Sequence, residues 1–451
     1  MRARDLAVLR DVPEGWWVEY KREPNGKLGI AKSIGAFANS EGGWIFYGIG
    51  EADVDGEKRA GSFEGIPKSD VARIKNDIRS AANHHVKPTP FYEVRALRGP
   101  CDDIGLPANR AVVVVVVAYG HDSPYVHSRG VIYRRKADEC DPVAETDRSR
   151  LDMLWERGRR ERSRLSALIT TGPALGESEG SLSYAQLFLL TDPHGERGYR
   201  SKIGIEQFRK AVGRDTDAEH VDLAFDATCQ IGDSYVARMV AGNAPYQFVP
   251  TLEYLSDCSS ITTVPLNTWP ILRSHDSLRE SLRRYTFGNE FLDLVDPDVR
   301  ELGAHVVDLN YLAVVIMGAF AKHRTLLEAE GTRLPVMVKL RLGNMWRRVP
   351  FVDMAEHLER IKREGLPVIE KQALMIPPGD EPESMLRMEA KDWRKMPGTN
   401  LLPTAIDLAL DALDALGVNA IRTSDDGLAI HLVEAAMRSG GEPTAEGHGI
   451  A

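Results

Sequence analysis

The chain has 451 residues, of which 43% are hydrophobic and 27% are charged. This composition predicts a soluble globular protein with two or three domains. The formal net charge of −9 argues against a general binder of polyanions. However, residues 1–160 carry 26 lysines and arginines against 24 acids, so the acidic excess lies in the rest of the chain. The N-terminal part can therefore still present a local basic face.

The four cysteines lie far apart and form no C-x-x-C pair. This predicts a reduced, cytoplasmic protein without a zinc site. The start of the chain lacks the apolar core of a signal peptide. The longest apolar runs, 111–118 and 312–321, are well short of the ~20 residues that a membrane helix needs. We therefore expect no membrane association.

The stretch 13–51 predicts a strand, a helix and a second strand. Residues 16–21 alternate in the period of a half-buried strand. Residues 27–39 place apolar side chains at helical spacing, and Gly42-Gly43 suits the left-handed conformation that closes a helix. Residues 44–49 are a short apolar run, which favours a central strand. Three acids bracket the stretch: Glu14, Glu19 and Glu51.

Further along, residues 52–67 are polar and glycine-rich, which predicts a surface loop. Ser69 can cap a helix that continues to about residue 82. A strand is expected at 92–97, and the six valines within 111–118 predict a strand covered on both faces. A further strand at 131–136 ends in three bases, Arg134, Arg135 and Lys136.

An arginine-rich helix is expected to start near Thr146 and to close the first domain. Within it, Arg157, Arg159 and Arg160 could hold a nucleic-acid backbone by charge. A plain solvated helix is an equally good interpretation of the part before Arg157.

The second half predicts an α/β domain of unknown role. We expect strands at 184–191, 234–241, 247–254 and 335–342 and helices at 205–212, 306–330 and 404–416. A further helix ends near residue 364, with Asp353 as its expected cap. The whole chain is thus expected to be α/β (α+β), with a first domain at 1–165, a Gly/Ser-rich linker at 166–183, a second domain at 184–439 and a flexible tail at 440–451.

Four blocks of the N-terminal part resemble the Schlafen AlbA-like domain family. They are Glu14, Glu19-Tyr20-Lys21, the run AFANSEGG at 36–43 and Gly48-Ile49-Gly50-Glu51. Family members carry a glutamate before an E-F-K triplet, an A-F-A-N-T-x-G-G block and a G-V-x-D strand end. The blocks fall in the family's order at compatible spacing, and the resemblance covers roughly residues 10–160. The chain departs from the pattern in having tyrosine at position 20 and a longer acid, glutamate, at position 51.

The resemblance implies a mixed sheet with flanking helices and the binding of RNA or DNA. In the branch of the family that cleaves RNA, acids at the places of Glu14, Glu19 and Glu51 bind a divalent metal, here Mg²⁺ or Mn²⁺. The substrate would be structured RNA such as tRNA, in a role in bacterial defence. The strand bearing Arg134 would lie on the face that meets nucleic acid, although a solvated strand end is the alternative.

The residues themselves are compatible with this chemistry. Hard divalent cations prefer carboxylate oxygens, and a bound ion would activate the attacking group and neutralise charge on the scissile phosphate. Lys21, on the strand face of Glu19, could contact that phosphate. The alternative is that Glu19 pairs with Lys21 or Arg22, while Glu14 caps and Glu51 is a loop acid.

Other chemistries lack their motifs. The chain has no G-x-x-x-x-G-K-[S/T] loop, so we expect no nucleotide cofactor. It also has no G-x-S-x-G nucleophile motif. Two hypotheses follow, a metal-dependent endoribonuclease and a non-catalytic AlbA-like DNA-binding or regulatory protein. A third is an assembly subunit that acts through its acidic second half, and we expect a homo-oligomer.

Overall fold

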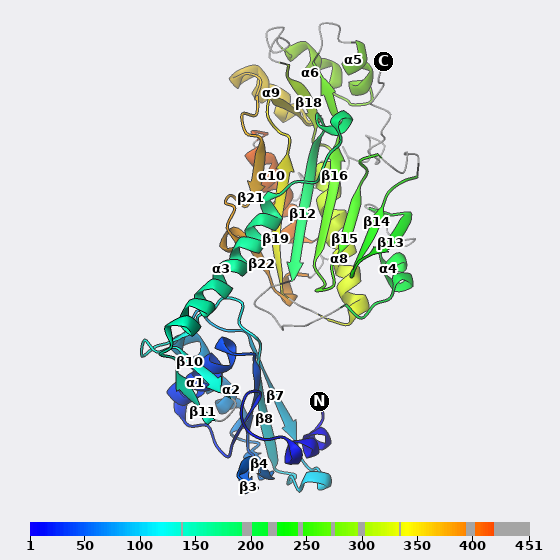
Figure 1. Ribbon diagram of the computed structural model, residues 1–451. Coiled ribbons are helices and arrows are strands. Elements are labelled where there is room, and N and C mark those ends of the chain that lie inside the picture. The colour runs from blue at the N-terminus through cyan, green and yellow to red at the C-terminus, as the bar shows by residue number, and fades with distance from the viewer. Residues whose placement is uncertain are drawn as a thin grey trace. The chain divides into compact units, whose positions relative to one another are not determined.

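The computed structural model describes residues 1–136, 139–191, 201–214, 223–241, 247–271, 276–295, 303–332, 335–393 and 402–418 (Figure 1). The chain divides into two compact units, with the boundary between Leu165 and Ser166. Each unit has its own sheet and its own hydrophobic core, which confirms the α+β class. None of the described helices is long and apolar enough to cross a membrane. The predicted tail at 440–451 lies outside the described residues.

The N-terminal unit is built on a mixed five-stranded sheet. Strand β1 runs parallel to β2, and β2, β5 and β7 all pair antiparallel with β8. The strands are β1 (Val18–Lys21), β2 (Gly43–Tyr47), β5 (Ile66–Pro67), β7 (Tyr92–Arg98) and β8 (Arg110–Val117).

Both faces of this sheet are covered, as the six valines of β8 predict. Val113 and Val115 pack in one core with helices α1 (Gly26–Asn39) and α2 (Val71–His85). Val112 and Val114 face the opposite core, which includes the N-terminal 3₁₀ helix η1 (Ala3–Asp11). Because successive side chains of a strand point to opposite faces, one continuous apolar run serves both cores.

The predicted surface loop at 52–67 is wrong, because a hairpin occupies most of it. Strands β3 (Gly50–Val54) and β4 (Glu57–Ser62) pair antiparallel around Asp55-Gly56. Both turn residues have positive φ, 57° and 82°. This is the turn that an Asp-Gly pair favours in a two-residue hairpin. The hairpin was not predicted because its polar strands lack an apolar alternation.

The rest of this unit consists of short strand pairs and helix α3. The elements are β6 (Val86–Lys87), β9 (Val126–His127), β10 (Tyr133–Lys136), β11 (Glu139–Ala144), η2 (Asp102–Ile104) and α3 (Arg148–Thr170). The predicted linker at 166–183 differs from the structure at its start, because α3 continues to Thr170. Arginine, leucine and alanine in this helix all have high helix propensity. The helix contains no proline, and its one glycine, Gly158, does not interrupt it.

The second unit contains an eight-stranded antiparallel sheet in the order β13-β14-β15-β16-β12-β19-β21, with β22 also paired to β19. Helix α8 packs against β12, β16, α4 and α10 (Figure 1). The elements are β12 (Ser183–Thr191), β13 (Ala227–Ile231), β14 (Ser234–Arg238), β15 (Thr251–Tyr254), β16 (Ser260–Leu266), β19 (Val336–Gly343), β21 (Ala373–Ile376), β22 (Leu386–Met388), α4 (Ile205–Val212), α8 (Leu312–Glu330) and α10 (Pro403–Ala415). Short 3₁₀ turns are η3 (Glu177–Glu179), η4 (Pro382–Ser384) and η5 (Ala390–Trp393).

A smaller sheet in the second unit corrects two further expectations. It consists of β17 (Thr268–Pro270), β18 (His305–Asp308) and β20 (Arg348–Phe351), with helices α5 (Asp276–Leu282), α6 (Gly288–Leu294) and α9 (Ala355–Glu364). The predicted helix 306–330 is wrong at its start, where the β-branched pair Val306-Val307 belongs to β18. Asp353 does not cap α9, because its carboxylate accepts the backbone N–H groups of Thr286 and Phe287 at 3.1 and 2.8 Å.

Candidate functional site

The three predicted acids of the N-terminal unit come together around one lysine. Glu14 precedes β1, Glu19 lies on β1 and Glu51 on β3. The Nζ atom of Lys21 lies 3.5 Å from Glu14 Oε1, 3.8 Å from Glu19 Oε1 and 3.4 Å from Glu51 Oε1. We call these four residues the acid cluster. Its geometry follows from the sheet, because β1 pairs with β2 and the chain leaves β2 directly into β3.

Within the acid cluster, Glu19 is the partner of a buried arginine. Glu19 is 1% exposed and Arg135 is fully buried. Arg135 Nη1 lies 3.1 Å from Glu19 Oε2, and Arg135 Nε donates a 2.8 Å hydrogen bond to the carbonyl of Gly15. The hydroxyl of Ser33 donates to Glu19 Oε1 at 2.8 Å. Both oxygens of Glu19 are therefore engaged inside the protein.

Arg135 was predicted to contact nucleic acid, and the structure corrects this placement. Its guanidinium lies over the ring of Phe37, 4.9 Å from the centroid, and is closed off from solvent. The reason is the alternation of β10, which turns the middle base of Arg134-Arg135-Lys136 inward while the flanking two stay half-buried. The sequence held this signal, but three adjacent bases were interpreted together as a strand end.

Glu14 is the least satisfied member of the acid cluster. Its side chain is buried, and Oε1 accepts the backbone N–H of Tyr20 at 3.3 Å. Oε2 has no hydrogen-bond partner among the described residues. Burial raises the pKa of Glu14 to about 7; the charge of Lys21 opposes this rise, and those of Glu51 and Glu19 add to it. Burial also raises the pKa of Glu19, against the charges of Arg135 and Lys21.

The raised pKa of Glu14 leads to a prediction on stability. A carboxyl with a higher pKa in the folded than in the unfolded state makes folding less favourable as the pH rises from about 4.5 to about 7. Glu14→Gln, which stays neutral, should therefore raise the melting temperature at pH 8 and leave it nearly unchanged at pH 4.5. The measurement is thermal unfolding across this range in EDTA. Glu57→Gln, on the exposed hairpin, is the control. A Glu14→Gln variant that melts lower than the parent at pH 8 would show that Lys21 outweighs burial.

The carboxylates of the acid cluster are suitable ligands for a hard divalent cation, but they are not arranged as a metal site. Carboxylate oxygens are the preferred ligands, and Glu14 Oε2 is a buried acceptor without a partner. Yet in the part of the chain that the structure describes, no three acids, histidines or cysteines are grouped so as to hold an ion. The lysine ammonium lies between the carboxylates instead. Lys21 is therefore not directed at an external phosphate, and Lys58 pairs with Glu51 at 3.1 Å.

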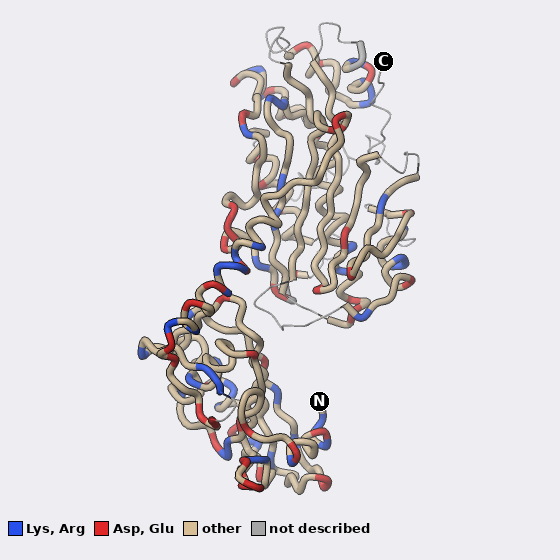
Figure 2. The backbone as a smooth tube through the Cα atoms, viewed as in Figure 1, with Lys and Arg blue, Asp and Glu red and all other residues tan. Residues whose placement is uncertain are grey.

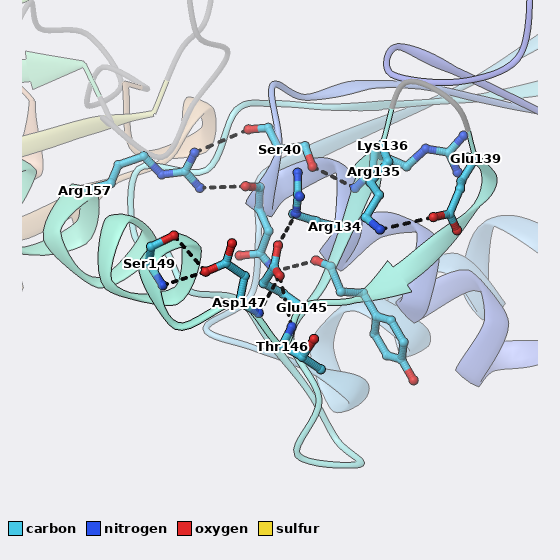
Figure 3. A network of polar contacts seen from close by, with 12 residues as sticks. Ser40, Arg134, Arg135, Lys136, Glu139, Glu145, Thr146, Asp147, Ser149 and Arg157 are labelled. Carbon is cyan, nitrogen blue, oxygen red and sulfur yellow. Dashed lines mark hydrogen bonds and ion pairs between the residues drawn. The ribbon is translucent and has the colours of Figure 1, made fainter.

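The remaining predicted bases lie on β10 and α3. Arg134 pairs with Glu145, and Lys136 Nζ lies 3.1 Å from Glu139 (Figure 3). Arg159 and Arg160 are exposed on α3 and lie 3.2 and 3.9 Å from Glu156.

Arg157 has a structural role that was not predicted. Its guanidinium donates to the carbonyls of Ala38 and Ser40 at the end of α1, at 3.2 and 3.3 Å, and to the Ser123 hydroxyl at 2.7 Å. It also lies over the ring of Tyr119, 4.2 Å from the centroid. A cation at the carboxyl end of a helix satisfies carbonyls that have no partner within the helix. Through these contacts Arg157 links α3 to the C-terminal end of α1 (Figure 3).

Sequence reasoning missed a cleft of about 710 Å³ beside these residues, which we call the α3 cleft. Its lining includes two aromatic rings, five arginines and four acids: Trp16, Tyr119, Arg134, Arg150, Arg157, Arg159, Arg160, Glu41, Asp152, Glu156 and Glu161. Arginines and acids alternate along α3 (Figure 2). Trp16 was expected to belong to a half-buried strand at 16–21, but β1 begins only at Val18 and Trp16 is 36% exposed. The available signal was the Gly15 break just before it.

Comparison with known proteins supports the resemblance on which the prediction of the acid cluster rests. Residues 14–144 match the family described as Schlafen, AlbA_2, which confirms the predicted resemblance for this part of the chain. A solution NMR structure of the N-terminal domain of a putative ATP-dependent DNA helicase RecG-related protein from Nitrosomonas europaea is also similar. It shares 20% identity over 33% of this chain and 96% of its own, with a TM-score of 0.25. No curated protein matches the chain.

Proposed function

We propose, from the match of residues 14–144 to the Schlafen, AlbA_2 family, that the N-terminal unit binds nucleic acid. The family supports a nucleic-acid-related function in the broad sense. The observation that carries the proposal further is the convergence of Glu14, Glu19 and Glu51 on one point of the domain. Clustered carboxylates suit a phosphodiester-cleaving site because they can hold a cation, and exposed arginines of the same unit, Arg159 and Arg160, could hold the backbone.

The finer proposal is a metal-dependent endonuclease that acts on structured RNA such as tRNA, in bacterial defence. Glu14 and Glu51 would hold Mg²⁺ or Mn²⁺, since Glu14 Oε2 has no partner among the described residues and Glu51 is partly exposed. When bound, the ion would polarise water and neutralise charge at the scissile phosphate. Glu19 would position the acid cluster through its contact with Arg135. The side chain of Lys21 would move out from between the carboxylates and turn toward the substrate.

One observation favours the alternative of a non-catalytic DNA-binding or regulatory protein. Lys21 lies 3.4 to 3.8 Å from all three carboxylates, Arg135 pairs with Glu19 and Lys58 pairs with Glu51. Three cations thus face three acids without any added ion. In that case the cluster is a structural ion network and the domain binds without cleaving.

A single set of assays tests both levels of the proposal. Purified full-length protein is mixed with labelled tRNA and with duplex DNA of matched length, in EDTA or in Mn²⁺, and binding and cleavage are followed separately. We expect salt-dependent binding of at least one nucleic acid, and cleavage of RNA only with the metal. Binding without cleavage under every condition would support the alternative. Absence of binding at low ionic strength would reject the proposal altogether. Light scattering of the same preparation tests the proposed homo-oligomer.

A further inference from the structure

The two walls of the α3 cleft are held in fixed positions relative to each other. One wall is α3 and the other contains Trp16 and Tyr119. Arg157 joins the walls through its contacts with the end of α1, and the Ser123 hydroxyl donates to the Leu154 carbonyl at 2.8 Å. At Gly158, a side chain would collide with the carbonyl of Ser123, so only glycine allows this approach. The cleft is therefore a preformed feature of the N-terminal unit.

The arginines of the cleft lining outnumber its acids by five to four, and three of these acids lie on α3. Residues 148–165 of α3 hold seven arginines and three acids. Arginines outside the cleft lining compensate two of these acids: Arg148 lies 3.7 Å from Asp152, and Arg164 lies 2.9 Å from Glu161.

Two of the arginines inside the cleft, Arg159 and Arg160, can therefore accept a new partner. Among the described residues, Glu156 is the one acid that pairs with Arg159 and Arg160, whose side chains are 66% and 78% exposed. Exposed pairs of this kind contribute little stability, so both arginines can exchange Glu156 for a phosphate at low cost.

The lining also offers a surface for a base. Trp16 is 36% exposed and lines the cleft together with the arginines. An aromatic ring beside a positively charged groove is the arrangement with which proteins hold single-stranded nucleic acid, because a base stacks on the ring while the backbone follows the charge. A volume of about 710 Å³ lies within the range of pockets that enclose a small ligand, which suits one or two unpaired nucleotides and not a duplex.

We infer that the α3 cleft binds an unpaired segment of nucleic acid, with a base stacked on Trp16 and phosphates held by Arg150, Arg159 and Arg160. This inference rests on the proposed function and names its substrate class: a loop or a single-stranded end. The cleft adjoins the acid cluster through the chain itself. Trp16 follows Gly15, whose carbonyl accepts from Arg135, and Arg135 follows the cleft residue Arg134. Two residues of the cleft lining are thus neighbours in sequence of residues that contact each other beside Glu19.

Matched variants test the inference. The probes are a fluorescent 12-residue oligouridylate and a duplex RNA of the same length, and binding to the full chain is measured by anisotropy at low salt. Trp16→Ala should weaken binding of the single strand by about tenfold, while Trp17→Ala, whose ring is 55% exposed outside the cleft lining, should not. Arg150→Ala should weaken binding and lower its dependence on salt. Arg148→Ala, on the same turn of α3 but outside the lining, should do so much less. Thermal unfolding of each variant confirms that it folds.

The outcomes separate this inference from the proposed function. If Trp16→Ala and Arg150→Ala bind like their controls while the parent binds nucleic acid, the cleft is not the site and the proposed function stands. If duplex and single strand compete equally, the preference for an unpaired segment is wrong. If the parent binds neither probe nor tRNA, the proposed function fails and this inference fails with it.

Discussion

Replacing Glu14 by glutamine should lower Mn²⁺-dependent cleavage of tRNA by about a hundredfold or more, since removal of even an outer-shell partner of a metal typically costs 10–100-fold. Glu14 is the acid whose Oε2 is buried without a partner among the described residues, so the substitution removes the negative charge best placed to attract a cation. Binding of tRNA should change little, because phosphate contacts dominate affinity and Glu14 makes none. The measurement is single-turnover cleavage alongside anisotropy, over a series of Mn²⁺ concentrations.

A control variant and a second ligand variant accompany this test. Glu57→Gln removes an acid from the neighbouring strand β4, where the side chain is 52% exposed and pairs with Arg59, and it should cleave like the parent. Glu51→Gln should reduce cleavage as Glu14→Gln does, because it is the second proposed ligand. If Glu14→Gln cleaves at the parent rate with the same requirement for Mn²⁺, the acid cluster does not hold the metal.

The acid cluster shows how far local sequence can predict a site. The alternation of 16–21 and the apolar run 44–49 are enough to predict two strands. In the structure these strands pair, and the chain that leaves the second one brings Glu51 toward Glu19. What the pattern could not show is the position of Lys21. Its Nζ takes the central place among the carboxylates, a result of side-chain packing that period and spacing do not determine.

Arg135 and the α3 cleft were missed for a different reason, because they depend on contacts between distant segments. Arg135 meets Glu19 across 116 positions of the chain, and Arg157 meets Ser40 across 117. From the sequence alone, every arginine is expected to lie on the surface, because arginine is rarely buried unless it is paired. In the second unit the same limit appears at Asp353, which accepts from a loop 66 residues earlier instead of capping the adjacent helix.

These long-range contacts make Glu19 of the acid cluster, together with Arg135, part of the buried interior of the N-terminal unit. Arg135 connects Glu19 on β1, the carbonyl of Gly15 and the ring of Phe37 on α1. The site and the fold are therefore coupled: a change at Glu19 alters the stability of the unit as well as its chemistry. For this reason Glu14 and Glu51 are better probes of catalysis than Glu19.

Replacing Arg135 by methionine should lower the free energy of unfolding of the N-terminal unit by about 3–5 kcal/mol. The side chain is fully buried and 3.1 Å from Glu19, so its loss leaves a carboxylate inside the protein with only the Ser33 hydroxyl and Lys21 to compensate it. Urea unfolding of the full chain, followed by hydrogen exchange in peptides of β1 and α1, reports on this unit alone. Lys136→Met, the half-buried neighbour paired with Glu139, should cost less than about 1 kcal/mol.

The double variant Glu19→Gln with Arg135→Met separates the ion pair from its surroundings. Removing both charges leaves no buried ion unpaired, so the double variant should be more stable than the sum of the two single losses predicts, by about 1–3 kcal/mol. Such coupling would establish that Glu19 is ionised and paired with Arg135 in the folded protein. Strictly additive losses would mean instead that the pair contributes through packing against Phe37, and that Glu19 is free to take up a proton or a cation.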